Sequence, residues 1–253
     1  MAKRNRETSL PPPFLKRVWL PDEHWRSACE SDVYPFSLSL IRSGALDIKF
    51  ERSVTTLVGE NGSGKSTILE AIAVMAGFDE RGGAQGMRAV SNTGNSGSDA
   101  GTLGELLRGA WLPQIRQGWF FRAETFHAVA TYLDDSGSEH AGFLSASHGE
   151  GFLQFFEERI TRQGLFILDE PEAALSPLKQ FEFLKLLRQM QLAENCQVIM
   201  ATHSPILMAL PEADLWQLDS FTIRPTVLEE TAHFRLYKEF VSYPHETVEA
   251  MIL

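Results

Sequence analysis

The chain has 253 residues, of which 43% are hydrophobic and 22% are charged, and this balance indicates an ordinary globular domain rather than a disordered or fibrous chain. A formal net charge of −10 argues against a protein whose whole surface follows a nucleic-acid backbone, because that mode of binding depends on dense lysine and arginine. No apolar run approaches the roughly 20 residues that span a bilayer, and the N-terminus lacks the apolar stretch of a secretory signal, so we expect a cytoplasmic protein.

Residues 1–17 predict a flexible basic tail. Five cations face a single acid in this stretch, and the triple proline Pro11–Pro13 cannot continue a helix. A solvated end without a partner is favoured over an arm that binds nucleic acid, because basic runs are common at chain termini. Residues 18–253 are then predicted to form a single domain.

The spacing of hydrophobic residues changes between residues 35 and 77. Residues 35–41 and 45–51 alternate polar and apolar side chains, which predicts two antiparallel strands with one solvated face. Residues 54–59 are short and β-branched and predict a third strand. From Lys65 onward the apolar residues recur at spacings of three and four, which predicts an amphipathic helix that ends near Gly77.

A glycine-rich stretch lies between that strand and that helix and fits the pattern G-x-x-x-x-G-K-S/T. Such a loop turns its backbone N–H groups around a phosphate, and the following helix adds its positive dipole end. Lys65 is expected to neutralise the β- and γ-phosphates, and the Ser66 hydroxyl to occupy one Mg²⁺ position. The predicted nucleotide-binding residues are Gly59, Glu60, Asn61, Gly62, Ser63, Gly64, Lys65, Ser66 and Thr67.

Two longer segments follow the predicted helix. Residues 79–104 are rich in Gly, Ser and Asn and are predicted to form a surface loop in preference to a lid over the nucleotide. Residues 103–163 are predicted to form a compact helical subdomain inserted in the main domain.

Two acids, Asp169 and Glu170, end a buried strand that is predicted at the start of residues 164–177. Ligands of open α/β sheets bind at the carboxyl ends of strands, so Asp169 is expected to hold the metal and Glu170 to orient and deprotonate the attacking water. The alternative is that both acids cap the next helix. That alternative is weak, because Ser176 and Pro177 already supply good N-cap and N1 residues.

His203 ends the next predicted strand, just before another helix start at Ser204. A lone histidine is more often structural than catalytic. Its expected place beside the Asp169 strand nevertheless makes His203 a candidate γ-phosphate sensor. Further on, an amphipathic helix around Phe234 and Phe240 is predicted to pack on the core.

Together, the segments GENGSGKST, LDEPEAALSP and ATHSPIL resemble the ATP-binding-cassette (ABC) ATPases, and within them the small stand-alone predicted ATPases. The resemblance covers most of residues 35–220. It implies an α/β P-loop NTPase fold with a mostly parallel central sheet, an N-terminal antiparallel part and a small helical subdomain. It also implies ATP and Mg²⁺ as ligands and a homodimer that encloses ATP, with Lys65, Glu170 and His203 as catalytic residues.

The family's signature sequence, usually L-S-G-G-Q, has a candidate in SASHGE. Ser147, Gly149 and Glu150 occupy the matching positions and are expected to contact the nucleotide of the opposing subunit, whereas His148 departs from the pattern. The alternative is a plain helix N-cap. A second departure is A-A-L-S at residues 173–176, where the family has S-A-L-D, so the contact made by that acid is not expected here.

Two further family features lack clear matches. Glu124, at the end of an aromatic strand, is the candidate third metal-site residue in place of the family's Gln, and an exposed acid at a helix start is an equal alternative. Tyr34 and Phe36 are candidates for stacking on adenine, although aromatic side chains beside a strand are more often part of the core.

Three functions compete at this point. The first is an ABC-type ATPase that dimerises around ATP and drives an unknown protein or nucleic-acid partner, with repair or defence as possible settings. The second is the nucleotide-binding subunit of a transporter, which would need a separate membrane protein. The third is a binding module without hydrolysis, which would be expected to lack Lys65 or Glu170. The weak signature and the DEPEAALSP segment favour the first.

Overall fold

A computed structural model of the protein describes residues 8–86, 99–122, 148–160 and 162–253, without the side chains of residues 27–29, 99–101 and 148–149. The strands are β1 (Leu15–Trp19), β2 (Asp47–Lys49), β3 (Val54–Val58), β4 (Gly83–Ala84), β5 (Arg108–Trp111), β6 (Gly118–Arg122), β7 (Gly164–Asp169), β8 (Cys196–Ala201), β9 (Asp214–Leu218) and β10 (Ile223–Thr226). The α-helices are α1 (Asp22–Cys29), α2 (Ser39–Arg42), α3 (Lys65–Met75), α4 (Asp99–Leu106), α6 (His148–Arg159), α7 (Pro177–Ala193), α8 (Pro205–Met208), α9 (Ala232–Ser242) and α10 (Pro244–Ile252). Short 3₁₀ turns, η1 (Pro171–Ala174) and η2 (Leu228–Glu230), complete the described elements.

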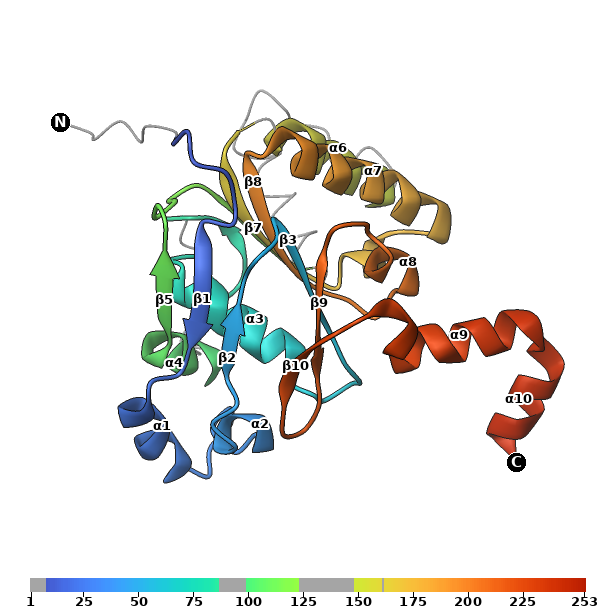
Figure 1. Cartoon of the computed structure of the whole chain (residues 1–253), viewed down its shortest axis with the longest axis horizontal. Coiled ribbons are helices and arrows are strands. Elements are labelled where there is room, and N and C mark those ends of the chain that lie inside the picture. The colour runs from blue at the N-terminus through green and yellow to red at the C-terminus, as the bar shows by residue number, and fades with distance from the viewer. Residues whose placement is uncertain (1–7, 87–98, 123–147, 161) are drawn as a thin grey trace.

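The central sheet has seven strands in the order β10-β9-β3-β8-β7-β6-β4 (Figure 1). Its five inner strands, from β9 to β6, run parallel, whereas the edge strands β10 and β4 are antiparallel. Leu57 of β3 and Asp169 of β7 both pair with Ala201 of β8, so these three strands end at the same edge of the sheet. The α/β fold predicted from the sequence, with its mostly parallel central sheet, is confirmed.

Alternate residues of the inner strands pack on opposite faces of the central sheet. On one face, Leu165 and Ile167 of β7 join a core with α3 and with the small antiparallel sheet β2-β1-β5. On the other face, Phe166 and Leu168 join a core beneath α6 and α7 (Figure 1). Strands that are buried on both sides have near-continuous apolar sequences, which is why β3, β7 and β8 could be predicted as strands from the sequence.

Gln197 ties the small sheet to the central one. Its side chain is fully buried in β8, and its Oε1 accepts hydrogen bonds from the backbone N–H groups of Phe14 and Leu15, both at 2.8 Å. Its Nε2 donates to the Leu15 carbonyl at 2.9 Å. The amide therefore satisfies three buried backbone groups where β1 begins.

The layer of α6 and α7 is built from aromatic side chains. Phe152 and Phe156 of α6 are fully buried and contact Phe121 of β6 and Phe183 of α7, with ring centroids 4.5–5.8 Å apart in edge-to-face or tilted arrangements. Such aromatic pairs add to the free energy of burial. This packing fixes α6 against the central sheet.

Three local expectations are corrected by the structure. Residues 35–41 do not form a strand, because the Pro35 carbonyl accepts the Leu38 N–H in a local turn, and Leu40 and Ile41 are both buried on α2. Strand β2 instead pairs with β1. The predicted tail ends earlier than Arg17, because β1 begins at Leu15 and buries that side chain completely.

The described part of residues 103–163 is not purely helical. It contributes β5 to the small sheet and β6 to the central sheet, between α4 and α6. The apolar run of β6 explains the difference, because Phe120 and Phe121 of the same strand are buried on opposite faces of the central sheet, as in a strand covered on both sides.

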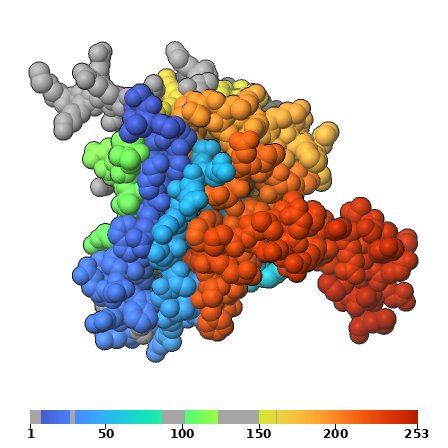
Figure 2. Space-filling view, viewed as in Figure 1, coloured from blue at the N-terminus to red at the C-terminus, as the bar shows by residue number. Residues whose placement is uncertain are grey.

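The C-terminal helices extend away from the rest of the chain as an arm, residues 232–252 (Figures 1 and 2). The predicted packing of this segment on the core is wrong: Tyr237 and Phe240 are 56% and 43% exposed, and α9 contains no buried residue. Amphipathic spacing alone specifies an apolar face and not what covers it. Among the described residues, no helix has both the length and the apolar character that a membrane span requires.

Candidate nucleotide site

The glycine-rich loop joins β3 to the N-terminus of α3. Gly62 and Gly64 have φ angles of 78° and 93°, a left-handed region that favours glycine. A side chain at Gly59 would place its Cβ 2.4 Å from the Leu218 carbonyl oxygen, so this position also requires glycine. Within the loop, Ser63 Oγ is buried and has no hydrogen-bond partner among the described residues.

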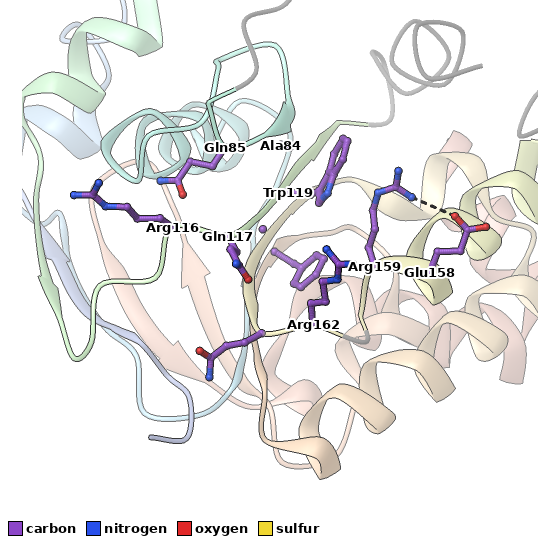
Figure 3. Close-up of a pocket in the computed structure, with 11 residues that line it drawn as sticks. Ala84, Gln85, Arg116, Gln117, Trp119, Glu158, Arg159 and Arg162 are labelled. Atoms are coloured by element: carbon purple, nitrogen blue, oxygen red, sulfur yellow. Dashed lines mark ion pairs between the residues drawn. The ribbon is translucent and has the colours of Figure 1, made fainter. Parts of the chain in front are cut away.

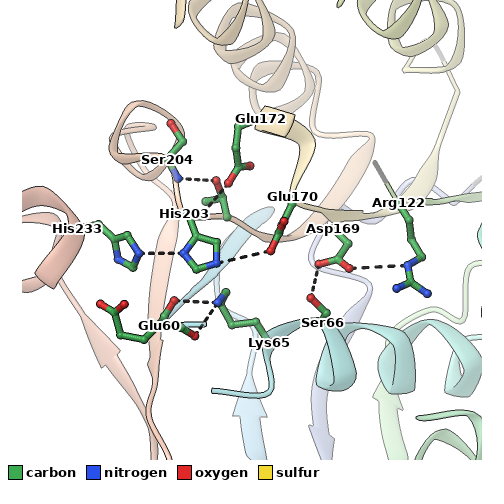
Figure 4. A network of polar contacts seen from close by, with 12 residues as sticks. Glu60, Lys65, Ser66, Arg122, Asp169, Glu170, Glu172, His203, Ser204 and His233 are labelled. Carbon is green, nitrogen blue, oxygen red and sulfur yellow. Dashed lines mark hydrogen bonds and ion pairs between the residues drawn. The ribbon is translucent and has the colours of Figure 1, made fainter. Parts of the chain in front are cut away.

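Lys65 begins α3 and bends back into the loop. Its Nζ is buried and donates to the carbonyls of Gly59 at 2.8 Å and Glu60 at 3.1 Å (Figure 4). Burial lowers the pKa of Lys65, and the carboxylates of Glu170 and Asp169 oppose that shift. The ammonium is thus buried against two loop carbonyls, with the carboxylates of Glu170 and Asp169 near enough to oppose the effect of burial.

Ser66 and Asp169 meet across the start of α3 and the end of β7. The Ser66 hydroxyl donates to Asp169 Oδ1 at 3.0 Å. Arg122, at the end of neighbouring β6, places Nε 3.9 Å from Asp169 Oδ2 and Nη2 2.6 Å from Glu70 Oε1. The carboxyl end of the sheet therefore carries a connected set of charges (Figure 4).

Glu170 follows β7 directly and has a left-handed backbone, with φ 48° and ψ 53°. Its N–H donates to the Ala201 carbonyl at 3.0 Å, and its Oε1 lies 3.6 Å from His203 Nε2. A non-glycine residue in this conformation carries strain, which often marks a functional position. The side chain is directed toward the loop that contains Lys65 (Figure 4).

His203 follows β8 and is held by its backbone as well as by its ring. Its N–H donates to Glu172 Oε1 at 2.6 Å, and its Nδ1 lies 2.9 Å from His233 Nε2. Burial lowers the pKa of His203, and the nearby Lys65 cation lowers it further. Burial raises the pKa of Glu172.

Of the predicted residues, those of the loop and Asp169, Glu170 and His203 come together at one edge of the sheet. Glu124 and Ser147 lie outside the described residues, and for Gly149 only the backbone, within α6, is described. Glu150 is exposed in the first turn of α6. The signature sequence therefore stays a prediction.

The two adenine candidates differ in their contacts. Tyr34 is 45% exposed, and its hydroxyl makes a hydrogen bond with Thr67 in the first turn of α3. Phe36 packs against the core cluster that contains α3. Which of the two stacks on adenine stays a prediction.

Four residues of this network were not predicted from the sequence: Glu70, Arg122, Glu172 and His233. Glu70 had a readable signal, because an acid four residues after Ser66 interrupts an otherwise apolar helix stripe. Glu172 and His233 had no such signal in the sequence. Glu172 accepts from the backbone N–H of His203, and His233 contacts the His203 ring, and both contacts join segments that are distant along the chain.

The donor set fits a magnesium–triphosphate ligand. Ser66 and Asp169 supply the hydroxyl and carboxylate oxygens that Mg²⁺ prefers. The unpartnered Ser63 hydroxyl and the helix N-terminus offer donors to phosphate oxygens. When bound, Mg²⁺ would neutralise phosphate charge next to Asp169.

A separate cavity of about 480 Å³ lies at the opposite ends of β6 and β7 (Figure 3). Arg116, Arg159 and Arg162 line it together with Trp119, and none of the predicted site residues does. The Arg159 guanidinium lies over the Trp119 ring, 4.7 Å from its centroid. This arginine-lined cavity is distinct from the candidate nucleotide site.

Two protein-family models match the chain. One, described as "AAA domain, putative AbiEii toxin, Type IV TA system", matches residues 129–209, and another, described as "AAA domain", matches residues 37–100. The first range contains Asp169, Glu170 and His203, and the second contains the glycine-rich loop. Both models describe AAA domains, so together with the mostly parallel sheet these matches support a P-loop ATPase of AAA type. No curated protein matches it.

Among solved structures, 145 chains match. One is a "putative metal-chelate type ABC transporter" in an inward-facing conformation, with 16% identity, a TM-score of 0.44, and coverage of 76% of this chain and 81% of its own. Another is cbiO1 of Clostridium perfringens, part of the ABC transporter complex cbiONQ, with 16% identity, a TM-score of 0.39, and coverage of 82% and 91%. A third is the SMC head domain of Thermotoga maritima, with 15% identity, a TM-score of 0.40, and coverage of 71% and 92%. Similarities this distant transfer no partner to the chain.

Proposed function

We propose that the protein binds ATP with Mg²⁺ and hydrolyses it to ADP and phosphate. The observation that carries the proposal is the convergence of Lys65, Asp169, Glu170 and His203 at one edge of the sheet, although they lie on three separate segments of the chain. Structural packing does not call for a buried lysine, two strand-end acids and a histidine within one network, whereas phosphoryl transfer to water does.

Each residue then has a defined role. The loop amides and Lys65 hold the phosphates, and Ser66 and Asp169 hold the metal ion. Glu170 orients the attacking water and accepts its proton, while His203 Nε2, 3.6 Å from Glu170, contacts the terminal phosphate. The bond from the γ-phosphorus to its bridging oxygen breaks as the bond to the water oxygen forms.

The proposal includes a head-to-tail homodimer that closes around two ATP molecules and is completed by Ser147, Gly149 and Glu150 of the opposing subunit. Dimer closure would drive a partner, for which repair or defence is the proposed setting. The matching family models support the ATPase chemistry, and the strand-end geometry supports the division of roles.

The test measures ATP hydrolysis and oligomeric state together. Glu170→Gln is expected to lower kcat by about 10²- to 10⁴-fold, the usual worth of a general base, while ATP binding persists. With ATP and Mg²⁺ this variant should form a stable dimer by light scattering, and adding Ser147→Arg should abolish the dimer.

The matched control is Glu246→Gln, which makes the same chemical change on the exposed surface of α10 and should leave kcat unchanged. Absence of calorimetric heat with ATP and Mg²⁺ in the wild type would contradict ATP binding, on which the whole proposal depends. Pull-down with the trapped Glu170→Gln dimer then separates the functional alternatives, because a membrane protein would indicate a transporter subunit, and DNA or another protein would indicate the first function.

A further inference from the structure

His203 contacts a second histidine that the proposed mechanism does not use. Its Nδ1 lies 2.9 Å from Nε2 of His233, with the two ring centroids 5.0 Å apart. At that separation one nitrogen carries a hydrogen and the other accepts it. In a neutral ring, the direction of this hydrogen bond decides whether His203 Nε2, which faces Glu170, carries a hydrogen.

The surroundings of the other ring nitrogen fix that direction. His203 Nε2 is buried without a hydrogen-bond partner among the described residues, and it faces Glu170 Oε1 at 3.6 Å. A lone pair at Nε2 would be repelled by this carboxylate, whereas an N–H is attracted to it. Burial and the Lys65 cation lower the pKa of His203, which favours the neutral ring with a single N–H at neutral pH. His203 Nδ1 is therefore the acceptor, and His233 Nε2 is the donor.

His233 is held in place although it belongs to the first turn of the arm. The N-cap Thr231 is fully buried, accepts the Phe234 N–H at 3.3 Å, and donates to the Leu228 carbonyl at 2.8 Å. Leu228 packs on a small cluster that includes Val58, the residue before the glycine-rich loop. The His233 ring thus keeps its position relative to the nucleotide site while the rest of α9 extends outward (Figures 1 and 4).

We propose that His233 is a positioning residue: by donating its Nε2–H to His203 Nδ1, it fixes the tautomer and orientation in which His203 presents Nε2–H to the terminal phosphate. The proposal rests on the proposed ATPase function. It deepens that function by extending the site from the end of β8 to the first turn of α9.

Two readouts test the proposal. Histidine ¹⁵N NMR of the nucleotide-free protein, with His203 assigned by loss of its signals in His203→Gln, should show Nδ1 of His203 unprotonated and Nε2 of His233 protonated. In His233→Phe the Nδ1 resonance of His203 should move toward that of a free acceptor nitrogen. A protonated His203 Nδ1 in the wild type would overturn the assignment.

Kinetics supply the second readout. His233→Phe should lower kcat by about 10- to 100-fold, the usual effect of losing an orienting hydrogen bond, with KM for ATP changed less than about threefold. His233→Gln keeps an N–H donor and should recover most of the rate. His245→Phe removes a histidine from the exposed face of α10 and should match the wild type.

The outcomes separate the two proposals. Wild-type kcat in His233→Phe, in a protein that hydrolyses ATP, overturns the positioning role and leaves the ATPase function standing. A wild type without hydrolysis refutes the ATPase function, and the spectra then decide the hydrogen-bond direction by themselves.

Discussion

The two ends of the parallel strands in the central sheet differ in what their residues contact. At the carboxyl ends, Lys65, Asp169 and His203 belong to a polar network in which Ser63 Oγ and His203 Nε2 are buried without a hydrogen-bond partner among the described residues. At the amino ends, the main chain of Gly118 packs closely against Leu165 beside the arginine-lined cavity, and the buried Cys196 thiol donates to the Arg162 carbonyl. The carboxyl ends keep polar groups available to a ligand at a cost in stability, whereas the close contacts of Gly118 and Cys196 stabilise the fold at the amino ends.

The largest expected effect tests the close packing at Gly118. Gly118 has φ 140°, and a Cβ there would lie 1.8 Å from the Leu165 carbonyl oxygen of β7. Because backbone cannot yield as a side chain can, Gly118→Ala should lower the free energy of unfolding by more than about 4 kcal/mol. Urea denaturation measures the change. Gly86→Ala is the control, with φ 81° but nothing within 4 Å of its Cβ, and should lose only about 1 kcal/mol.

The reactivity of the Cys196 thiol tests the burial of this residue at the amino end of β8. Burial raises the pKa of its thiol to about 12. In a Cys29→Ser background, alkylation of native Cys196 at pH 8 should be at least about a thousandfold slower than that of free cysteine, because the thiolate is the reactive form. Mass spectrometry follows the rate, and the same protein in urea is the control. Rapid native labelling would show that the Cys196 thiol is accessible to solvent in the folded protein.

At the polar end, Glu172→Ala removes the acceptor of the His203 N–H and should cost about 1–3 kcal/mol of unfolding free energy. Glu172→Gln keeps an acceptor oxygen and removes the ionisable group. Burial raises the pKa of Glu172 above its ordinary 4.5, so the wild type should lose stability relative to Glu172→Gln as pH rises through 4.5 toward the folded-state pKa. A pH series of urea melts checks this sign, and a pH-independent difference would contradict it.

The smallest effect is expected on the arm. Leu236→Ser and Phe240→Ser remove side chains that are 41% and 43% exposed, so each should change the free energy of unfolding by less than about 0.5 kcal/mol. Phe156→Ala, in the aromatic layer, should lose about 3–5 kcal/mol by the same measurement. A large loss from either serine variant would mean that the arm packs on the core in solution.

The parts that sequence reasoning predicted well are those that local patterns specify. The loop from Gly59 to Ser66 and the helix after it follow from residue type and spacing, and strand β7 follows from an uninterrupted apolar run. Residues 35–41 were misassigned because alternation over so short a run also fits a turn and a helix of one turn.

The remaining failures concern contacts between distant segments. The partner of His203 lies 30 positions further along the chain, and no spacing rule connects the two rings. The arm has the apolar periodicity of a packed helix, yet no residue of α9 is buried. Periodicity predicts a face, and only tertiary structure shows what meets it.

The amide of Gln197 has a consequence for which residues this position can accept. Glutamate there could still accept from Phe14 and Leu15 but would turn a negative charge toward the Leu15 carbonyl, and methionine would fill the space while leaving all three main-chain groups unpaired. Only a side chain that both donates and accepts hydrogen bonds can satisfy all three groups and hold the two sheets together at this point. Homologues that keep this junction are therefore expected to keep glutamine.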